Sequence, residues 1–165
     1  MRKVASGLFI SLDGVTEAPD QWQFDVFDED MGAVMAAYLA TEDTILLGRK
    51  TYQEWADYWP NSDDPYYGTH INSTPKHVFS RTLKEASWGN WENITLVKSS
   101  LAEEVARLKA LPGQTIGVAG SPGLVRSLLQ ADLLDELILM FHPVIVGHGK
   151  RLFDGWSDLK EEDLV

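Results

Sequence analysis

The chain has 165 residues, no cysteine, and 25 acidic residues against 14 lysines and arginines, which gives a formal net charge of −11. The length fits one domain, residues 1–165, that can bury a substantial core without disulfides or metals. The absence of cysteine excludes a disulfide framework, a thiolate nucleophile and cysteine-bound zinc. The negative charge argues against nucleic acid or an anionic membrane as the main partner, so local clusters of cations become informative.

The first apolar stretch, residues 2–12, predicts a strand rather than a targeting segment. It is short, contains polar residues and runs into Asp13, unlike a secretory signal. No stretch is long enough to span a membrane, and we expect a cytoplasmic protein. Asp13 and Gly14 have turn chemistry, and residues 15–23, which lack periodicity, predict a loop that forms a flap over a site.

A helix with an acidic start is predicted next. Its apolar residues recur at helical spacing: Met31, Val34, Met35, Tyr38 and Leu39. Four acids stand at or just before its first turn: Asp25, Asp28, Glu29 and Asp30. Because the helix dipole favours acids in a first turn whatever their chemistry, none of the four is marked as catalytic by position alone.

Residues 44–52, TILLGRKTY, form the segment around which the predicted fold is organised. The apolar run of Ile45 to Leu47 predicts a buried parallel strand that stops at Gly48. A helix then begins at Arg49-Lys50-Thr51, and its first N–H groups have no partner within the helix. Free N–H groups, a hydroxyl and two cations suit a phosphate. A plain strand-to-helix turn with two solvated cations is the alternative.

The rest of the chain alternates short strands with helices. Residues 60–74 look irregular, and strands are predicted at 75–81 and 94–97. A helix capped by Ser99 or Ser100 follows at 101–111. Residues 115–119 predict a strand that breaks at Gly120 before another helix, and residues 133–146 predict a long apolar strand before a turn. The alternation predicts an α/β fold with a mostly parallel sheet.

Three predicted strand ends carry residues suited to phosphate. They are Gly48 to Thr51, Ser80-Arg81 and Gly120 to Leu124. In open α/β sheets, ligands bind beyond the carboxyl ends of the strands, and a dinucleotide needs several anion sites. Ser80 and Arg81 suit the 2′-phosphate of NADP. Each signal alone is weak, because Ser121 and Pro122 also fit an ordinary helix start.

The sequence resembles the dihydrofolate reductase-like superfamily and, within it, bacterial stand-alone relatives of the riboflavin-biosynthesis reductase domain. The resemblance is carried by five segments: SLDGV (11–15), LLGRKTY (46–52), VFSRTL (78–83), GVAGSPGLVRSLLQADLLDEL (117–137) and HPVIVGHGKRLF (142–153). It implies a three-layer α/β/α sandwich whose mostly parallel central sheet has an antiparallel C-terminal strand. It also implies NADPH as cofactor, hydride transfer to a small nitrogen heterocycle, pterin-like or ribosylaminopyrimidine-like, and a homodimer.

The resemblance also assigns roles to residues. It implies that Arg49, Lys50 and Thr51 hold the cofactor's phosphates, with Gly48 allowing close approach, and that Ser80 and Arg81 hold the 2′-phosphate. The resemblance implies that Gly120, Ser121, Pro122, Gly123 and Leu124 bind the pyrophosphate, and that Gly117 is a further cofactor-binding residue. Asp13 would lie beside the nicotinamide.

A nicotinamide reductase needs one group that helps a proton reach the substrate. Asp13 is the first candidate, followed by Glu17 and Glu29, although Asp13 also fits a purely structural turn. Trp22 and Tyr52 are candidates to stack on a flat substrate, although aromatic residues more often pack in a core. His142 and His148 have no metal-site spacing, and no metal is expected. Two other readings stay open: a non-catalytic NADPH-binding module, and an enzyme that binds a mononucleotide or sugar phosphate.

Overall fold

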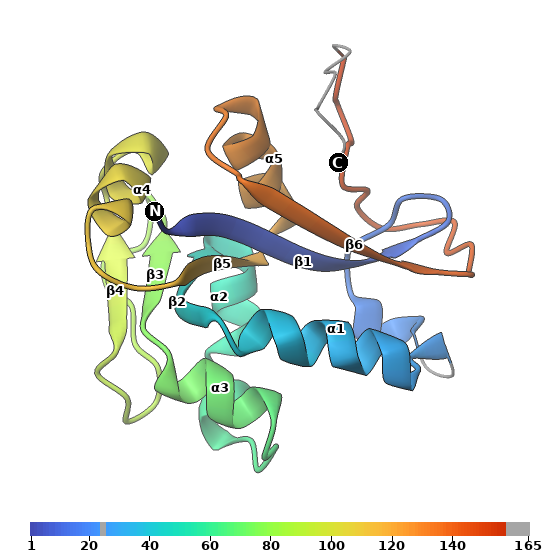
Figure 1. Cartoon of the computed structure of the whole chain (residues 1–165), viewed down its shortest axis with the longest axis horizontal. Coiled ribbons are helices and arrows are strands. Elements are labelled where there is room, and N and C mark those ends of the chain that lie inside the picture. Colours follow the sequence, from blue (N-terminus) through green and yellow to red (C-terminus); the bar gives the residue numbers. More distant parts are fainter. Residues whose placement is uncertain (24–25, 158–165) are drawn as a thin grey trace.

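A computed structural model describes residues 1–23 and 26–157, in which one six-stranded sheet lies between two layers of helices (Figure 1). The strands are β1 (Lys3–Ser11), β2 (Glu42–Gly48), β3 (Lys76–Phe79), β4 (Ile94–Val97), β5 (Thr115–Gly120) and β6 (Glu136–His142). The helices are α1 (Glu29–Leu39), α2 (Arg49–Trp55), α3 (Tyr67–Ser73), α4 (Leu101–Lys109) and α5 (Pro122–Gln130), with short 3-10 turns at Pro19–Gln21 and Trp59–Asn61. The strand order is β4-β3-β2-β5-β1-β6, which confirms the α/β prediction.

All six strands are parallel, so the expected antiparallel C-terminal strand is wrong. Helix α5 carries the chain back to the edge where the other strands begin, and the backbone N–H of Asp135 donates to the carbonyl of Val4 at 2.8 Å. β6 therefore starts beside the start of β1 and runs with it. The strand is also shorter than the predicted 133–146, because Pro143 has no N–H with which to continue the ladder.

Two apolar clusters, one on each face of the sheet, form the core. Successive side chains of β2 point to opposite faces of the sheet and so contribute to both clusters. Leu46 belongs to one cluster, and Ile45 and Leu47 belong to the other. The first cluster includes residues of α4 and α5, and the second includes residues of α2 and α3. A strand covered on both faces is the arrangement that the unbroken apolar run predicts.

The predicted helix starts are largely confirmed, and one helix was missed. Ser100 caps α4 in a reciprocal capping box with Glu103. Asp28 caps α1 by accepting the N–H of Met31 at 2.9 Å. Residue 25, the first of the four acids, lies outside the described residues. Helix α3 occupies part of the region expected to be irregular, where the Asp64 carboxylate accepts the N–H of Gly68 at 2.9 Å.

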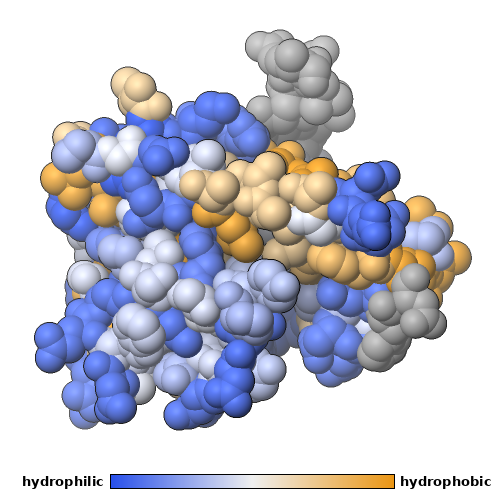
Figure 2. All heavy atoms as spheres, turned by 60° about the horizontal axis from the view of Figure 1, so that its bottom comes forward, coloured by the Kyte–Doolittle hydropathy of each residue, from blue (hydrophilic) through white to orange (hydrophobic). Residues whose placement is uncertain are grey.

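Helix α1 is unusual because none of its residues is buried. Ala33, Ala36 and Ala40 are exposed, Val34 is 44% exposed, and the apolar band crossing the face in Figure 2 includes this helix. Within residues 1–23 and 26–157, no helix is both long and apolar enough to cross a bilayer.

Candidate active site

The end of β2 and the end of β5 meet at two glycines. A β carbon on Gly48 would lie 2.7 Å from the hydroxyl oxygen of Ser121 and 2.9 Å from its backbone nitrogen. A β carbon on Gly120 would lie 2.8 Å from Oγ1 of Thr51. The Ser121 hydroxyl does not cap α5 but instead lies 3.2 Å from the Thr51 hydroxyl. Only glycine at positions 48 and 120 lets the starts of α2 and α5 approach each other this closely.

The end of β3 adds cationic groups to the same edge. β3 pairs with β2, and the Arg49 guanidinium donates to the Thr82 hydroxyl at 3.2 Å. The Ser80 hydroxyl accepts the N–H of Leu83 at 3.0 Å and so fixes this turn. The side chain of Arg81 is exposed and has no hydrogen bond or ion pair within the described part of the chain. The three predicted phosphate segments therefore lie at the ends of three adjacent strands.

Lys76 does not belong to this group. It begins β3, at the opposite end of the strand from Arg81, and is fully buried. Its ammonium donates to the carbonyls of Ile71 and Thr74, both at 2.7 Å. Burial lowers the pKa of Lys76 to about 8. We therefore read Lys76 as a structural residue that holds the end of α3.

A cleft of about 1410 Å³ opens beside these strand ends. It is bounded by the flap, by α1, by the aromatic side of α2 and α3, and by β5. Of the residues predicted for the cofactor, Lys50, Thr51, Gly120, Ser121, Pro122 and Gly123 line it. The others, Gly48, Arg49, Ser80, Arg81, Gly117 and Leu124, do not. Leu124 packs its side chain in the core, and Gly117 lies inside β5 beneath the side chain of Glu42.

Asp13 lies outside the cleft lining and is held by several donors. Its carboxylate accepts the Ser11 hydroxyl at 2.6 Å and the N–H groups of Val146 and Gly147 at 3.0 and 2.8 Å. The Ser11 hydroxyl, followed by the two backbone groups, keeps the pKa of Asp13 well below its usual range. An acid with these partners joins two loops and is poorly suited to release a proton near neutral pH.

Glu17 lines the cleft, and both oxygens of its carboxylate accept hydrogen bonds within the protein. One carboxylate oxygen accepts the Lys50 ammonium at 2.7 Å, and the other accepts the N–H of Lys150 at 3.0 Å. The bond from Lys50, and then that from the Lys150 backbone, lowers the pKa of Glu17, while Glu17 raises the pKa of Lys50. Glu17 therefore ties the flap to the start of α2 as an ionised carboxylate.

The two aromatic candidates, Trp22 and Tyr52, lie in different parts of the structure. Trp22 lines the cleft, donates to the Glu17 carbonyl at 2.9 Å and packs edge-on against His142, with ring centroids 5.4 Å apart. Tyr52 is in the core, where its hydroxyl bonds to the backbone of Ser87. Glu29 begins α1 on the surface and does not line the cleft.

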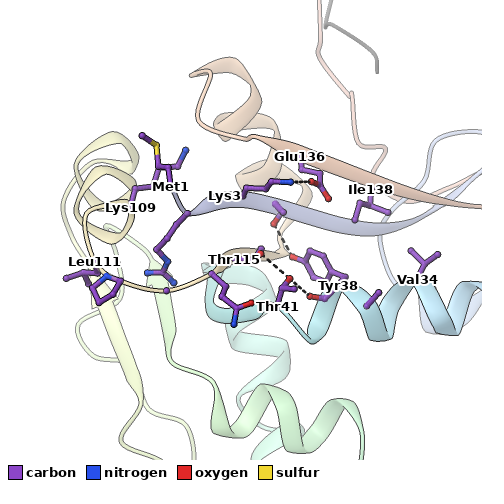
Figure 3. A pocket seen from close by; sticks show the side chains of 16 residues that line it. Met1, Lys3, Val34, Tyr38, Thr41, Lys109, Leu111, Thr115, Glu136 and Ile138 are labelled. Atoms are coloured by element: carbon purple, nitrogen blue, oxygen red, sulfur yellow. Dashed lines mark hydrogen bonds and ion pairs between the residues drawn. The ribbon is translucent and has the colours of Figure 1, made fainter.

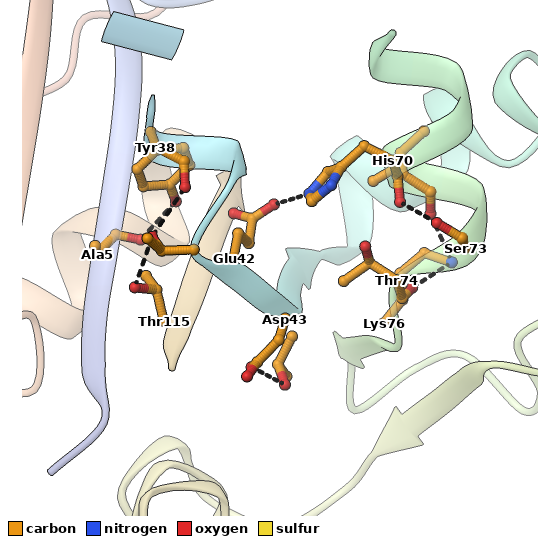
Figure 4. Close-up of polar contacts among 12 residues, drawn as sticks. Ala5, Tyr38, Glu42, Asp43, His70, Ser73, Thr74, Lys76 and Thr115 are labelled. Atoms are coloured by element: carbon orange, nitrogen blue, oxygen red, sulfur yellow. Dashed lines mark hydrogen bonds and ion pairs between the residues drawn. The ribbon is translucent and has the colours of Figure 1, made fainter. Parts of the chain in front are cut away.

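Sequence reasoning missed the residues at the far end of the cleft. Glu42 begins β2, lines the cleft and has a side chain that is 2% exposed. One of its oxygens lies 2.8 Å from Nε2 of His70 (Figure 4). A β carbon on Gly117 would lie 1.5 Å from the other oxygen and 2.7 Å from the Tyr38 hydroxyl. Burial, followed by the charge of Glu42, raises the pKa of Tyr38. No local sequence signal joins these four residues.

A second cavity of about 800 Å³ lies at the edge where the strands begin (Figure 3). Val34, Tyr38 and Ile138 line both cavities, so they form the wall between them. This cavity contains none of the predicted site residues. The first cleft is therefore the candidate active site.

Comparison with known proteins identifies the family. The sequence profile of the RibD C-terminal domain matches residues 2–164. The chain belongs to the RibD C-terminal domain family. It is 34% identical over 157 residues to the uncharacterized protein YyaP of Bacillus subtilis (strain 168), covering 92% of this chain and 80% of that one.

Solved structures show the same fold at lower identity. A candidate riboflavin biosynthesis protein from Shewanella sp. PV-4 superposes with a TM-score of 0.73 at 23% identity, covering 97% of this chain and 86% of that one. Dihydrofolate reductase from Enterococcus faecalis, in complex with NADP(H), gives 0.57 at 15% identity, with 90% and 75% covered. The predicted dihydrofolate reductase-like fold of this RibD C-terminal domain relative is therefore confirmed.

Proposed function

We propose that the protein is a reductase that uses NADPH to transfer a hydride to a small nitrogen heterocycle. The observation that carries the proposal is the meeting of Gly48, Thr51, Gly120 and Ser121 at one edge of the sheet, with Arg81 one strand away. Ligands of open α/β sheets bind at this edge. Family membership and the dihydrofolate reductase-like fold support a reductase.

The residues at the strand ends fit a dinucleotide phosphate. The first N–H groups of α2 and α5 suit the phosphate bridge, and the two glycines let the two helix starts lie close enough together to bind one anion. Arg81 is an exposed cation without a protein partner in the described ranges, so it would hold the 2′-phosphate with little reorganisation. When bound, the cofactor supplies the hydride.

The chain's own acids shape the site. We propose that Asp13 fixes the loop at residues 146–147 and that Glu17 holds the flap against Lys50, since each carboxylate is engaged and ionised. The prediction that Asp13 donates the proton stays open, but its partners do not favour it. Trp22 lies where the flap meets the cleft and would exclude water from a bound ring.

A titration of the purified protein with NADPH and NADH tests the proposal. We expect NADPH to bind at least tenfold more tightly, and loss of nicotinamide absorbance with one or more reducible pterins or aminopyrimidines. Tight NADPH binding without turnover of any such ring would favour a non-catalytic NADPH-binding module. Binding of nucleoside monophosphates but of neither dinucleotide would favour a phosphate-ester enzyme and overturn the proposal.

We also propose that two copies of the chain associate. Helix α1 buries none of its residues, and Ala33 and Ala36 in it and Ala40 at its C-terminal end are exposed. Val34 of α1 and Ile138 of β6, the edge strand, line the same cavities, and Phe141 of β6 is 56% exposed. A second copy is the partner we infer, because an exposed apolar helix beside an open strand is otherwise costly in water. The homodimer implied by the family resemblance agrees with this proposal.

A further inference from the structure

Lys50 lies between the flap and the proposed phosphate site. It immediately precedes Thr51, whose hydroxyl lies 3.2 Å from the Ser121 hydroxyl where the two helix starts meet. The Lys50 ammonium donates to one carboxylate oxygen of Glu17, in the flap, at 2.7 Å. Both side chains line the cleft. The ion pair therefore joins the flap to α2 at the edge of the sheet where we propose that the cofactor's phosphates bind.

The pairing of Lys50 differs from that of the other basic residues in the cleft lining, which are Arg126, His148 and Lys150. Among these four, and within residues 1–23 and 26–157, Lys50 alone lies within 4.0 Å of a carboxylate. Arg126 instead donates to the backbone carbonyl of Asp154 at 2.6 Å. An anionic side chain therefore occupies a cation that an incoming phosphate would use.

Glu17 and a phosphate repel each other if both contact the Lys50 ammonium. The hydrogen bond from Lys50, followed by that from the Lys150 backbone, lowers the pKa of Glu17, so its carboxylate is ionised at neutral pH. A phosphate bound to the same ammonium would place a second anion next to this carboxylate, and like charges at such a short distance disfavour that arrangement. One of the two anions should therefore leave.

The ion pair between Lys50 and Glu17 is weak enough to be replaced. The two side chains are 49% and 33% exposed, so water and salt screen their attraction. Exposed ion pairs of this kind change an equilibrium by at most about fivefold. The phosphates of a dinucleotide carry more negative charge than one carboxylate and accept strong hydrogen bonds from an ammonium. The phosphate should therefore be the anion that stays.

The base of the flap has other contacts that do not involve Lys50. The second oxygen of Glu17 accepts the N–H of Lys150 at 3.0 Å, and the N–H of Thr16 donates to the carbonyl of Lys150 at 3.0 Å. The indole of Trp22 donates to the Glu17 carbonyl at 2.9 Å. Loss of the ion pair would therefore leave the flap attached and would free one oxygen of Glu17, a residue of the cleft lining.

We propose that the cofactor's phosphates displace Glu17 from Lys50, so that Glu17 competes with the cofactor in the free protein and has one free carboxylate oxygen in the complex. This inference rests on the proposed function and adds a residue that lowers cofactor affinity. Because Lys50 is the main cause of the low pKa of Glu17, the exchange should raise that pKa. Cofactor binding would thereby make Glu17 a better proton carrier than it is in the free protein.

The test is a double-mutant cycle on Glu17 and Lys50, in which calorimetry at low ionic strength measures the binding of NADPH and, separately, of inorganic pyrophosphate. Glu17→Gln should bind both about three- to fivefold more tightly than the wild type. In the Lys50→Met background, Glu17→Gln should change either affinity less than about 1.5-fold, because the ammonium for which the anions compete is gone. General repulsion between Glu17 and the phosphates would instead give the same gain in both backgrounds.

Glu54→Gln is the matched control. Glu54 also lines the cleft, lies 4.0 Å from the Lys50 ammonium and has a side chain that is 61% exposed, so the substitution removes the same charge beside the same cation. Because Glu54 does not form a hydrogen bond to Lys50 at that distance, its substitution should change both affinities less than about 1.5-fold. A second readout is the pKa of Glu17, followed by NMR of its carboxyl carbon, which should rise when NADPH is added.

Several results would overturn the inference: unchanged or weaker binding by Glu17→Gln, an equal gain with and without Lys50, an equal gain by Glu54→Gln, or a pKa of Glu17 that stays constant or falls in the complex. If pyrophosphate binds and follows the expected cycle but NADPH does not bind, the proposed function fails and the exchange at Lys50 stands. If neither binds, both are wrong.

Discussion

Gly48 and Ser121, seventy-three residues apart in the chain, are in such close contact that no side chain fits between them. This contact joins the end of β2 to the end of β5 and places two helix starts side by side. We expect Gly48→Ala to cost about 1–3 kcal/mol of stability, because the methyl group meets a backbone nitrogen at 2.9 Å. NADPH affinity should fall more than tenfold.

The control for this variant is Gly32→Ala. Gly32 is in α1, and its added methyl group would lie at an ordinary 3.6 Å from the Phe27 ring. That variant should keep NADPH affinity and should be as stable as the wild type or more so. If Gly48→Ala bound NADPH as tightly as Gly32→Ala, the junction would not be the phosphate site. Calorimetry gives the affinities and thermal unfolding gives the stabilities.

Arg81→Ala should discriminate between the two nicotinamide cofactors. An arginine held against one phosphate contributes about 1.5–3 kcal/mol, which corresponds to about 10- to 100-fold in affinity. NADPH binding should weaken by that factor, and NADH binding should change less than twofold. Lys84→Ala, a change at an exposed residue three positions later, serves as control. An equal loss for both cofactors would remove the 2′-phosphate assignment.

The Asp13 carboxylate should contribute to stability across the neutral range. Its pKa is lowered in the folded protein, so its contribution is present above the ordinary carboxyl pKa and is lost as the pH falls through the folded value. Asp13→Ala should therefore lower Tm by a constant amount from pH 8 to pH 5, and by less at more acidic pH. Thermal unfolding over this pH range measures the difference. A difference that vanished already at pH 6 would contradict the role of the ionised Asp13 carboxylate in holding the loop at residues 146–147.

Lys76→Met should be strongly destabilising. The buried ammonium donates to three carbonyls and to the side-chain oxygen of Asn93, and methionine would remove this donor from all four acceptors. The expected cost is about 3 kcal/mol in free energy of unfolding. Lys84→Met should cost less than about 0.5 kcal/mol. Similar denaturant midpoints for both variants would show that Lys76 is not structural.

Ala36→Glu tests association between copies. Ala36 is exposed on α1 and lines neither cavity, so a charge there should disrupt packing against a second copy and yield a monomer in light scattering, with the far-UV circular dichroism unchanged. Tyr66→Glu, on a residue 84% exposed just before α3, should leave the association unchanged. A wild type that is monomeric at high concentration would contradict the proposed homodimer.

The sequence predicted those parts of the fold whose signals are local. The apolar run before Gly48 and the capping residues of α4 each depend on a few neighbouring residues, and both were found. The direction of β6 could not be predicted from neighbouring residues in the sequence. It depends on where α5 delivers the chain, and the contact between Asp135 and Val4 spans 131 residues.

The candidate site shows the same division. The glycine junctions could be predicted, because glycine and proline within a short segment mark the point where a strand ends and a helix begins, and neighbouring cations indicate an anion site. Glu42 was not visible, since an acid before a strand normally faces solvent. Its burial depends on a missing side chain at Gly117 and on His70, residues far away in the sequence. Tyr52 shows the reverse error, because an aromatic residue near the phosphate segment turned out to pack in the core.

Three separate strand ends should bind one dinucleotide. An NMR titration of the amide resonances of the labelled protein with NADPH tests this binding mode. We predict that the amides of residues 49–51, 80–82 and 120–124 shift together with one midpoint, while those of α4 do not. Shifts confined to one of the three segments, or different midpoints for each, would show that the three segments do not bind one dinucleotide.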